Sequence, residues 1–296
     1  MNLREILRRR VLTIAFHERD VRWTAGAHGR IDTIGSAPLP EHLVRDAVIT
    51  DPVSAGAILR AVPGPPAGRM MRVIVAVPAQ RSLFRQIDVP AVKGAQLDEV
   101  IEREIRREMP MLADNARVSW AIGAEHEGKT RVFVAGAPRD VLDSHVAAVR
   151  AAGLAPDAVD LRVIAASRAI GASDAVVANV EDGEIEIAII RDGIPLVIRH
   201  VAMAPQDDEA WKDQMAAELA RTLKFYCDSH RDDDIVPSLP ISFVGGAARR
   251  AILAEQVTLS TGHEVAMPPL RVSVDPEDQS VRFAANIGLA LKEVAA

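Results

Sequence analysis

The segment over residues 175–201 constrains the fold of this chain most, because it has the pattern of an antiparallel β-meander with two tight turns. Three apolar or alternating runs lie within it, at residues 176–180, 184–190 and 194–201. Asp-Gly pairs at 182–183 and 192–193 separate the runs and supply the positive φ angles that short hairpins need. The spacing predicts three strands joined by consecutive hairpins.

A weaker counterpart of this pattern lies near the N-terminus, over residues 11–36. There the strand-like runs VLTIAF, VRWTA and RIDTIGS are separated by a loop at 17–20 and a glycine-containing turn at 26–29. Each of the two meanders leads into sequence that alternates between strand and helix patterns. The sequence therefore predicts a duplicated α/β architecture.

Composition narrows the class of protein. A length of 296 residues predicts about two domains with a substantial core. The net charge of −6 and the aromatic content of 3% exclude a basic or base-stacking nucleic-acid surface. Cys227 is the only cysteine, which rules out an internal disulfide and indicates a reducing compartment. No apolar run reaches the roughly 18 residues of a membrane span, so we expect a cytoplasmic protein.

Between the meanders, the block over about residues 82–155 has strands and helices of its own. Its expected strands lie at 85–89, 117–124 and 130–135, and its expected helices at 96–108 and 140–152. We interpret it as an inserted α+β subdomain. The predicted division is a first half at 1–81 and 156–172, the insert at 82–155, and a second half at 173–296.

Helix and strand patterns also fill the two halves. The expected helices lie at 51–62, 161–170, 207–228, 249–256 and 283–294, and further strands at 71–80 and from 241. In the long helix at 207–228, apolar residues recur every three or four positions, which is typical of a helix with one buried face.

A series of short motifs carries a family resemblance, at residues 73–78, 87–90, 96–110, 151–160, 191–193, 221–226, 243–247 and 285–291. In this order and spacing they resemble the type IV pilus assembly protein PilM family, a member of the actin-like group that includes the cell-division protein FtsA. The resemblance covers nearly the whole chain. It implies an α/β, actin-like (RNase H-like) duplicated fold with an inserted subdomain of the FtsA and PilM type.

The resemblance also implies a nucleotide held between the halves by two phosphate loops. Such loops need glycine for close backbone approach and aspartate for the Mg²⁺ shell. The Asp-Ile-Gly pattern of the family aligns with Ala15-Phe16-His17 in the first copy and Asn179-Val180-Glu181 in the second. A carboxylate about 4 Å from a phosphate charge costs roughly 4 kcal/mol at an effective dielectric of about 20. We therefore expect no bound metal, no ATP cofactor and a pseudo-ATPase.

The adenosine side of the family's site corresponds to Gly245 and Gly246. These glycines are the candidate cofactor-binding residues. The alternative is a turn required for packing a strand against the following helix.

The function that the resemblance implies is that of a cytoplasmic scaffold in a type IV pilus assembly or related secretion machine. Implied partners are the cytoplasmic tail of a PilN-like inner-membrane protein, bound in a groove beside the inserted subdomain, and the assembly ATPase complex. Self-association through residues 1–4 is a further possibility. The alternatives are the actin-like cytoplasmic domain of a type II secretion protein similar to GspL, a weakly active actin-like ATPase or kinase, and a filament-forming protein.

Overall fold

The computed structural model describes residues 10–27, 30–60, 71–92, 94–112, 115–203, 207–231, 234–248, 255–272, 274–275 and 277–292. The N-terminal residues 1–4 and most of the helix predicted at 249–256 lie outside the described residues. Within the described part of the chain, no helix is both long and apolar enough to cross a membrane.

The first half is built on a five-stranded sheet with the order β10-β6-β1-β2-β3. Its strands are β1 (Arg10–Phe16), β2 (Asp20–Ala27), β3 (Arg30–Pro38), β6 (Met71–Val77) and β10 (Pro156–Leu161). The first three form the antiparallel meander that the sequence predicts, and β6 and β10 continue the sheet in parallel with β1.

The second half repeats this arrangement in the sheet β13-β12-β11-β14-β15. Its strands are β11 (Ala175–Val180), β12 (Glu184–Arg191), β13 (Ile194–Ala202), β14 (Ile241–Val244) and β15 (Val265–Ala266). Again the first three are antiparallel, and the last two are parallel to the first strand of the meander. The same order and strand sense in both sheets confirm the predicted duplication.

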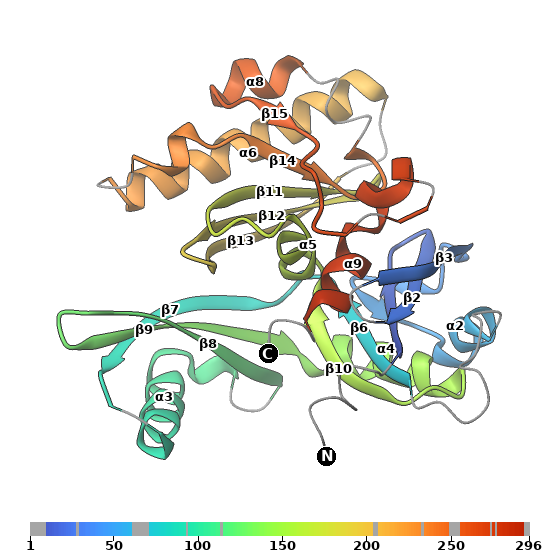
Figure 1. The fold of residues 1–296 in the computed structure, drawn as a ribbon, viewed down its shortest axis with the longest axis horizontal. Helices are drawn as coiled ribbons and strands as arrows, with labels where there is room; N and C mark the ends of the chain where they lie inside the picture. Colours follow the sequence, from blue (N-terminus) through green and yellow to red (C-terminus); the bar gives the residue numbers. More distant parts are fainter. Residues whose placement is uncertain are drawn as a thin grey trace.

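Helices fill the space between the sheets and cover their outer faces (Figure 1). Between the sheets lie α5 (Arg162–Ile170) and α9 (Ala284–Leu291), whose small and branched side chains join the cores of both halves. On the outer face of the first sheet lie α2 (Pro52–Leu59) and α4 (Arg139–Ala151). The second sheet is covered by α6 (Asp208–Ser229) and α8 (Glu255–Thr261).

The long helix α6 follows from its sequence pattern. Asp207 caps its start by accepting a hydrogen bond from the Ala210 N–H at 2.9 Å. Its buried face is formed by the residues that recur every three or four positions, among them Trp211, Met215 and Leu219. Cys227 packs at the edge of the same core and is half-buried.

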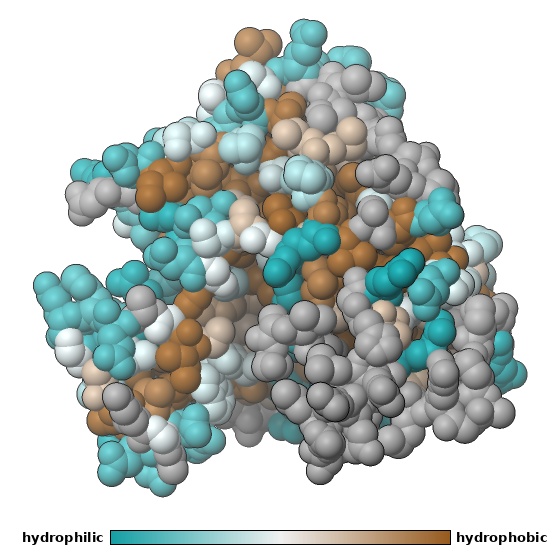
Figure 2. Space-filling view, in the orientation of Figure 1, coloured by the Kyte–Doolittle hydropathy of each residue, from teal (hydrophilic) through white to brown (hydrophobic). Residues whose placement is uncertain are grey.

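A separate three-stranded sheet, in the order β7-β9-β8, extends from the first half. It consists of β7 (Leu83–Pro90), β8 (Ala116–His126) and β9 (Lys129–Pro138), with α3 (Ala95–Glu108) packed on one face through Ile101 and Ile105. The helix α4 lies inside the predicted insert, yet it packs on the first sheet through Ala148 and Val149. An open notch with hydrophilic rims lies between the outer parts of this inserted sheet and of the second half (Figure 2). Elsewhere the two are in contact, since Gln86 Nε2 of β7 donates to the Pro195 carbonyl oxygen of β13 at 3.4 Å.

Several short elements have no counterpart in the sequence prediction. They are β4 (Val44–Arg45), β5 (Val48–Ile49), η1 (Pro110–Leu112), η2 (Val236–Ser238) and η3 (Glu277–Phe283). The strand β10 was not predicted either, because its six residues include a proline and two aspartates, which are uncommon in strands. Asp157 adds a side-chain contact to the pairing of β10 with β6, since its carboxylate accepts a hydrogen bond from the Val73 N–H of β6 at 2.8 Å.

Candidate functional site

Two hairpin turns, one from each meander, line the same cleft between the halves. In the first turn, the His17 N–H donates to the Asp20 carbonyl oxygen at 2.8 Å. In the second, the Glu181 N–H donates to the Glu184 carbonyl oxygen at 2.9 Å. The turns are therefore equivalent in the two halves, in the register that the alignment of the two motif copies implies.

The cleft has a volume of about 490 Å³. It is bordered by the two hairpin turns, by the turn after β14 and by η3, and its lining residues include His17, Glu18, Arg22, Glu181, Gly245, Gly246, Gln279 and Arg282. Charged side chains of both signs dominate this lining. The cleft is therefore a polar site, and the ligands it can bind depend on which of these charged side chains are already paired with one another.

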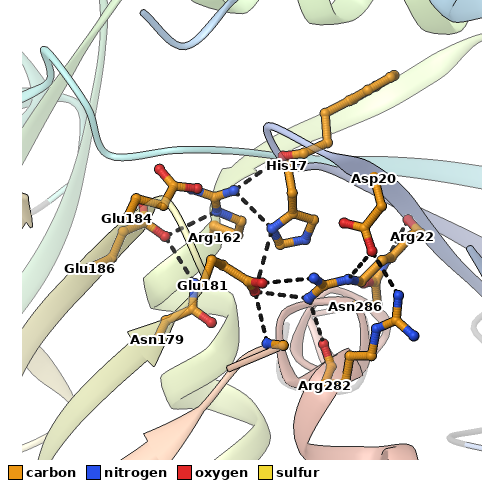
Figure 3. A network of polar contacts seen from close by, with 12 residues as sticks. His17, Asp20, Arg22, Arg162, Asn179, Glu181, Glu184, Glu186, Arg282 and Asn286 are labelled. Atoms are coloured by element: carbon orange, nitrogen blue, oxygen red, sulfur yellow. Dashed lines mark hydrogen bonds and ion pairs between the residues drawn. The ribbon is translucent and has the colours of Figure 1, made fainter. Parts of the chain in front are cut away.

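A buried ion pair between Arg22 and Glu181 crosses the cleft (Figure 3). The Arg22 Nη1 donates to Glu181 Oε1 at 2.8 Å, and Nη2 donates to Oε2 at 2.7 Å. A third donor, the Gly246 N–H, reaches Glu181 Oε1 at 3.1 Å. Burial opposes the charge of Arg22, but the carboxylates of Glu181 and Asp20 outweigh it and raise the pKa of the guanidinium. The pair is therefore charged and bidentate.

Asp20 and Arg282 extend this pair to the rim of the cleft. Asp20 Oδ2 accepts from the Arg22 Nε at 2.9 Å and from the Arg282 Nη2 at 2.7 Å. The Arg282 backbone carbonyl accepts a further hydrogen bond from Arg22 Nη1 at 3.1 Å. The guanidinium of Arg22 is thus bound by three groups: the Asp20 carboxylate of β2, the Glu181 carboxylate and the Arg282 carbonyl of η3.

A second buried network surrounds Arg162, the first residue of α5. Its Nε donates to Glu186 Oε2 at 3.0 Å and its Nη2 to Glu184 Oε1 at 2.5 Å. Its Nη1 lies 3.1 Å from the Phe16 carbonyl oxygen and 3.0 Å from His17 Nδ1. Arg162 therefore joins the first turn to β12 of the second half.

The two glutamates in this network have further partners. Glu186 accepts from the Ala79 N–H at 2.6 Å and from the Asn179 Nδ2 at 3.1 Å. Glu184 lies 2.8 Å from the His200 Nε2. Burial alone would raise the pKa of Glu184, but Arg162 and His200 outweigh it and lower that pKa to about 2.

His17 lies between the two networks. Because Arg162 donates to its Nδ1, the proton of a neutral ring is on Nε2. Burial is the main cause that lowers the pKa of His17 well below its usual value, and the nearby Arg22, Arg162 and Arg282 add to it. His17 Nε2 has no hydrogen-bond partner among the described residues. The ring is therefore an uncharged member of a charged site.

The structure brings four of the six predicted site residues to the cleft, namely His17, Glu181, Gly245 and Gly246. Ala15 is instead buried in β1, within the cluster that joins the first sheet to α5 and α9. Asn179 is buried in β11 and bound to Glu186.

The two glycines have different roles in the turn after β14. Gly245 has a φ of +101°, so it is the residue in the left-handed region that favours glycine. Gly246 has no such φ, but a Cβ there would lie 2.6 Å from both Arg22 Nη2 and Glu181 Oε2. The absence of a side chain at Gly246 allows the backbone N–H to approach the ion pair.

Sequence reasoning missed the cations that occupy the site, Arg22, Arg162 and Arg282. A signal for two of the missing contacts was present, since Glu184 and Glu186 alternate with isoleucines in a strand that is buried along nearly its whole length. Buried carboxylates require cationic or hydrogen-bonding partners. The identity of those partners depends on residues far away in the chain.

The residues at the nucleotide and Mg²⁺ positions differ from those that the family resemblance implies. The aspartates that the family resemblance implies are replaced by Ala15 and Asn179, and Glu186 binds the Asn179 amide. The donors that Arg22 and Gly246 present to the cleft are engaged by Glu181. Among the residues that the structure describes, no three His, Cys, Asp or Glu side chains form a group that could hold a metal ion.

A second concave site lies between the first half and the inserted sheet. We call it the groove; its volume is about 580 Å³. It is lined mainly by residues of β8, β9, β10, α4 and α5, including Ser119, Ala135, Leu142, Val146, Leu161 and Ile164. Phe84 and Phe133 stack within it, with ring centroids 5.9 Å apart and planes 9° apart. The groove is thus largely apolar, in contrast to the charged cleft.

Two edge strands border the groove. Among the described strands, β8 pairs with β9 alone, and β10 pairs with β6 alone. One cluster of charged groups at the groove is centred on Asp160, which binds both Arg168 and Lys292 at 3.0 Å. An edge strand has backbone N–H and C=O groups that another chain can pair with.

Comparison with solved structures places this architecture among known folds. The chain is similar to one in the PilM-PilN type IV pilus biogenesis complex, with a TM-score of 0.77 and 19% identity over 96% of this chain and 98% of that one. It is also similar to the ethanolamine utilization protein EutJ from Carboxydothermus hydrogenoformans, with a TM-score of 0.55 and 15% identity over 98% and 93%. The cytoplasmic domain of EpsL, from the type II secretion system of Vibrio cholerae, has a TM-score of 0.49 and 14% identity over 85% and 95%.

The duplicated sheets, the cleft between them and the likeness to the first two of these structures define an actin-like fold, which confirms the predicted fold class. No curated protein matches the chain. A family model for the type IV pilus assembly protein PilM matches residues 20–202, which is more than half of the sequence. The chain belongs to the PilM family, as the sequence motifs indicate.

Proposed function

We propose that this protein is a scaffold of a type IV pilus assembly machine or a related secretion machine, and that its groove binds the cytoplasmic tail of an inner-membrane partner similar to PilN. Membership of the PilM family and the likeness to a chain of a PilM-PilN complex support this assignment. The observation that supports the location of this binding site is the apolar groove between two edge strands, β8 and β10.

The groove is suited to an extended segment with apolar side chains. Such a segment gains main-chain hydrogen bonds at a strand edge, while alternate side chains enter pockets. The stacked rings of Phe84 and Phe133 offer an apolar surface for those side chains. Ordering a flexible tail has a large entropic cost, so we expect a micromolar rather than a nanomolar dissociation constant.

The partner also defines the proposed location. A protein bound to the cytoplasmic tail of an inner-membrane protein is held at the cytoplasmic side of that membrane without a span of its own. The assembly ATPase complex is a further proposed partner.

Two neighbouring residues of α4 allow a matched test of the groove. Val146 lines it, whereas Ala147 does not. A synthetic peptide of the cytoplasmic tail of the organism's PilN-like protein is titrated by calorimetry into the wild type, Val146→Asp and Ala147→Asp. We expect Val146→Asp to weaken binding at least tenfold and Ala147→Asp to bind as the wild type does. Unchanged affinity in Val146→Asp, with folding verified by its melting curve, would place the tail elsewhere.

We propose further that the protein is a pseudo-ATPase. The engaged donors of the cleft and the loss of both aspartate positions support this view. Calorimetry with ATP and Mg²⁺ is expected to give no binding heat, and a phosphate-release assay no turnover. Micromolar, Mg²⁺-dependent affinity would overturn this part of the proposal and leave the groove assignment intact.

A further inference from the structure

The donors around Glu181 form a receptor for an oxyanion. Two come from the guanidinium of Arg22 on β2, and the third is the Gly246 N–H in the turn after β14. Neither residue is a sequence neighbour of Glu181. Charged and backbone N–H donors that converge from separate elements on one anion are the arrangement by which proteins bind carboxylate and phosphate.

The receptor lies on the wall of the cleft and is not sealed inside the core. Arg22, Glu181 and Gly246 all line the cleft volume of about 490 Å³. That volume is many times the roughly 30 Å³ of a water molecule, so there is room for a small oxyanion beside the donors. The network of Arg162 differs, because Arg162 and Glu186 are buried and do not line the cleft, so that of its carboxylates only Glu184 borders that volume.

Removal of the Glu181 side chain would leave the receptor without its anion. The Arg22 Nε would still bind Asp20, and Nη1 would still reach the Arg282 carbonyl oxygen. The outer N–H groups that face Glu181, and the Gly246 N–H, would then face the cleft. A buried guanidinium that loses the carboxylate on two of its three nitrogens is unfavourable, even with Asp20 still on Nε, which creates a driving force for an external anion.

We infer that Glu181 is a built-in ligand of an oxyanion site in the cleft: it occupies the donors of Arg22 and Gly246 and keeps phosphate-bearing ligands out. Because Glu181 belongs to the same chain, it competes at a high effective concentration with any free anion. The same contacts join β2 of the first half to the second half, so the halves are held together by the chain's own charges. This inference is independent of the proposed partner of the groove.

The test uses inorganic pyrophosphate and propionate as probes, the latter because it has the shape of the missing side chain. Melting temperatures are measured for the wild type, Glu181→Ala and the double variant Arg22→Met/Glu181→Leu, in each probe and in sodium chloride of equal ionic strength. We expect Glu181→Ala to melt lower than the wild type in chloride. At a probe concentration about 100-fold above its Kd, its melting temperature should rise by roughly 5 °C or more.

The wild type and the double variant are the controls. Neither should respond to the probes beyond the chloride reference, because the first has its site filled and the second has lost the guanidinium. A response of the double variant equal to that of Glu181→Ala would mean adsorption at other basic residues and would overturn the inference. An absent response in Glu181→Ala would overturn it too.

A second readout covers the case in which Glu181→Ala does not fold in chloride. The refolding yield from denaturant is then compared with and without pyrophosphate. A yield that rises severalfold for Glu181→Ala, and not for the double variant, supports the built-in ligand. Equal yields in both conditions contradict it.

Discussion

Arg22 on β2 and Glu181 in the turn after β11 are 159 residues apart in the chain, yet their side chains share two hydrogen bonds of 2.8 and 2.7 Å. The two residues belong to equivalent hairpins of the two halves. Their pairing is a direct attraction between the halves. The cleft of this PilM-family protein is therefore stabilised by its own side chains.

The first prediction concerns the energy of this pair. Removing one partner of a buried ion pair leaves an uncompensated charge and typically costs about 3 to 5 kcal/mol, whereas an apolar replacement of both is often nearly neutral. We expect Arg22→Met and Glu181→Leu each to lower the free energy of unfolding by that amount. The double variant should be more stable than either single variant. Urea denaturation measures all four proteins, and additive costs would contradict the prediction.

The second prediction separates the roles of Gly245 and Gly246. Gly245→Ala should cost about 1 to 3 kcal/mol, because alanine is strained at positive φ and its Cβ would lie 2.5 Å from the Val180 carbonyl oxygen. Gly246→Ala should also destabilise, but by displacing Arg22 and Glu181. In the Arg22→Met/Glu181→Leu background, the cost of Gly246→Ala should therefore shrink while that of Gly245→Ala persists. Equal costs in both backgrounds would show that Gly246 is required by the turn itself.

The third prediction is a loss of stability in acid that depends on His145. Burial is the main cause that lowers the pKa of His145 to about 4, and its ring packs edge-on against Phe16 with centroids 5.4 Å apart. The unfolded chain takes up a proton at this histidine below about pH 6.5, and the folded protein does so only near pH 4. Stability is therefore complete above about pH 6.5 and falls as the pH drops towards 4. The total loss is on the order of 3 kcal/mol.

The check is urea denaturation between pH 7 and pH 4 for the wild type, His145→Leu and His126→Leu. The histidine at 126 is exposed on the inserted sheet and serves as the matched control. We expect the pH slope to become shallower in His145→Leu alone. Glu184 contributes in a lower window, because its folded pKa of about 2 lies below its ordinary value of 4.5 and its stabilisation is lost as the pH falls between these values. An unchanged slope in His145→Leu would mean that protonation of His145 does not cause the loss of stability in acid.

Much of the fold could be predicted because its signals are local. The Asp-Gly turns at 182–183 and 192–193, and the alternation around them, fixed the second meander. The recurrence of apolar residues every three or four positions likewise predicted α3 and α6. The strand β10 escaped prediction because its pairing with β6 depends on a sheet already in place.

The sequence predicted which turns form the candidate site, but not which side chains pair within it. The motif alignment placed His17 and Glu181 at equivalent turns, and the turns do line one cleft. From the sequence alone, we expect the Glu181 carboxylate to repel a phosphate group. The structure shows that its carboxylate is already bound by Arg22 and Gly246.

The sequence by itself determined the two meanders, the inserted sheet and the family, because turn chemistry and periodicity act over about ten residues. Tertiary structure alone decided which charges meet: Arg22 with Glu181, and Arg162 with Glu184 and Glu186. It also decided that α4 packs on the first sheet and that an apolar groove lies between β8 and β10. The physical reason is that such contacts depend on how the two halves and the insert are placed together, and no local pattern encodes a distance between residues so far apart in the chain.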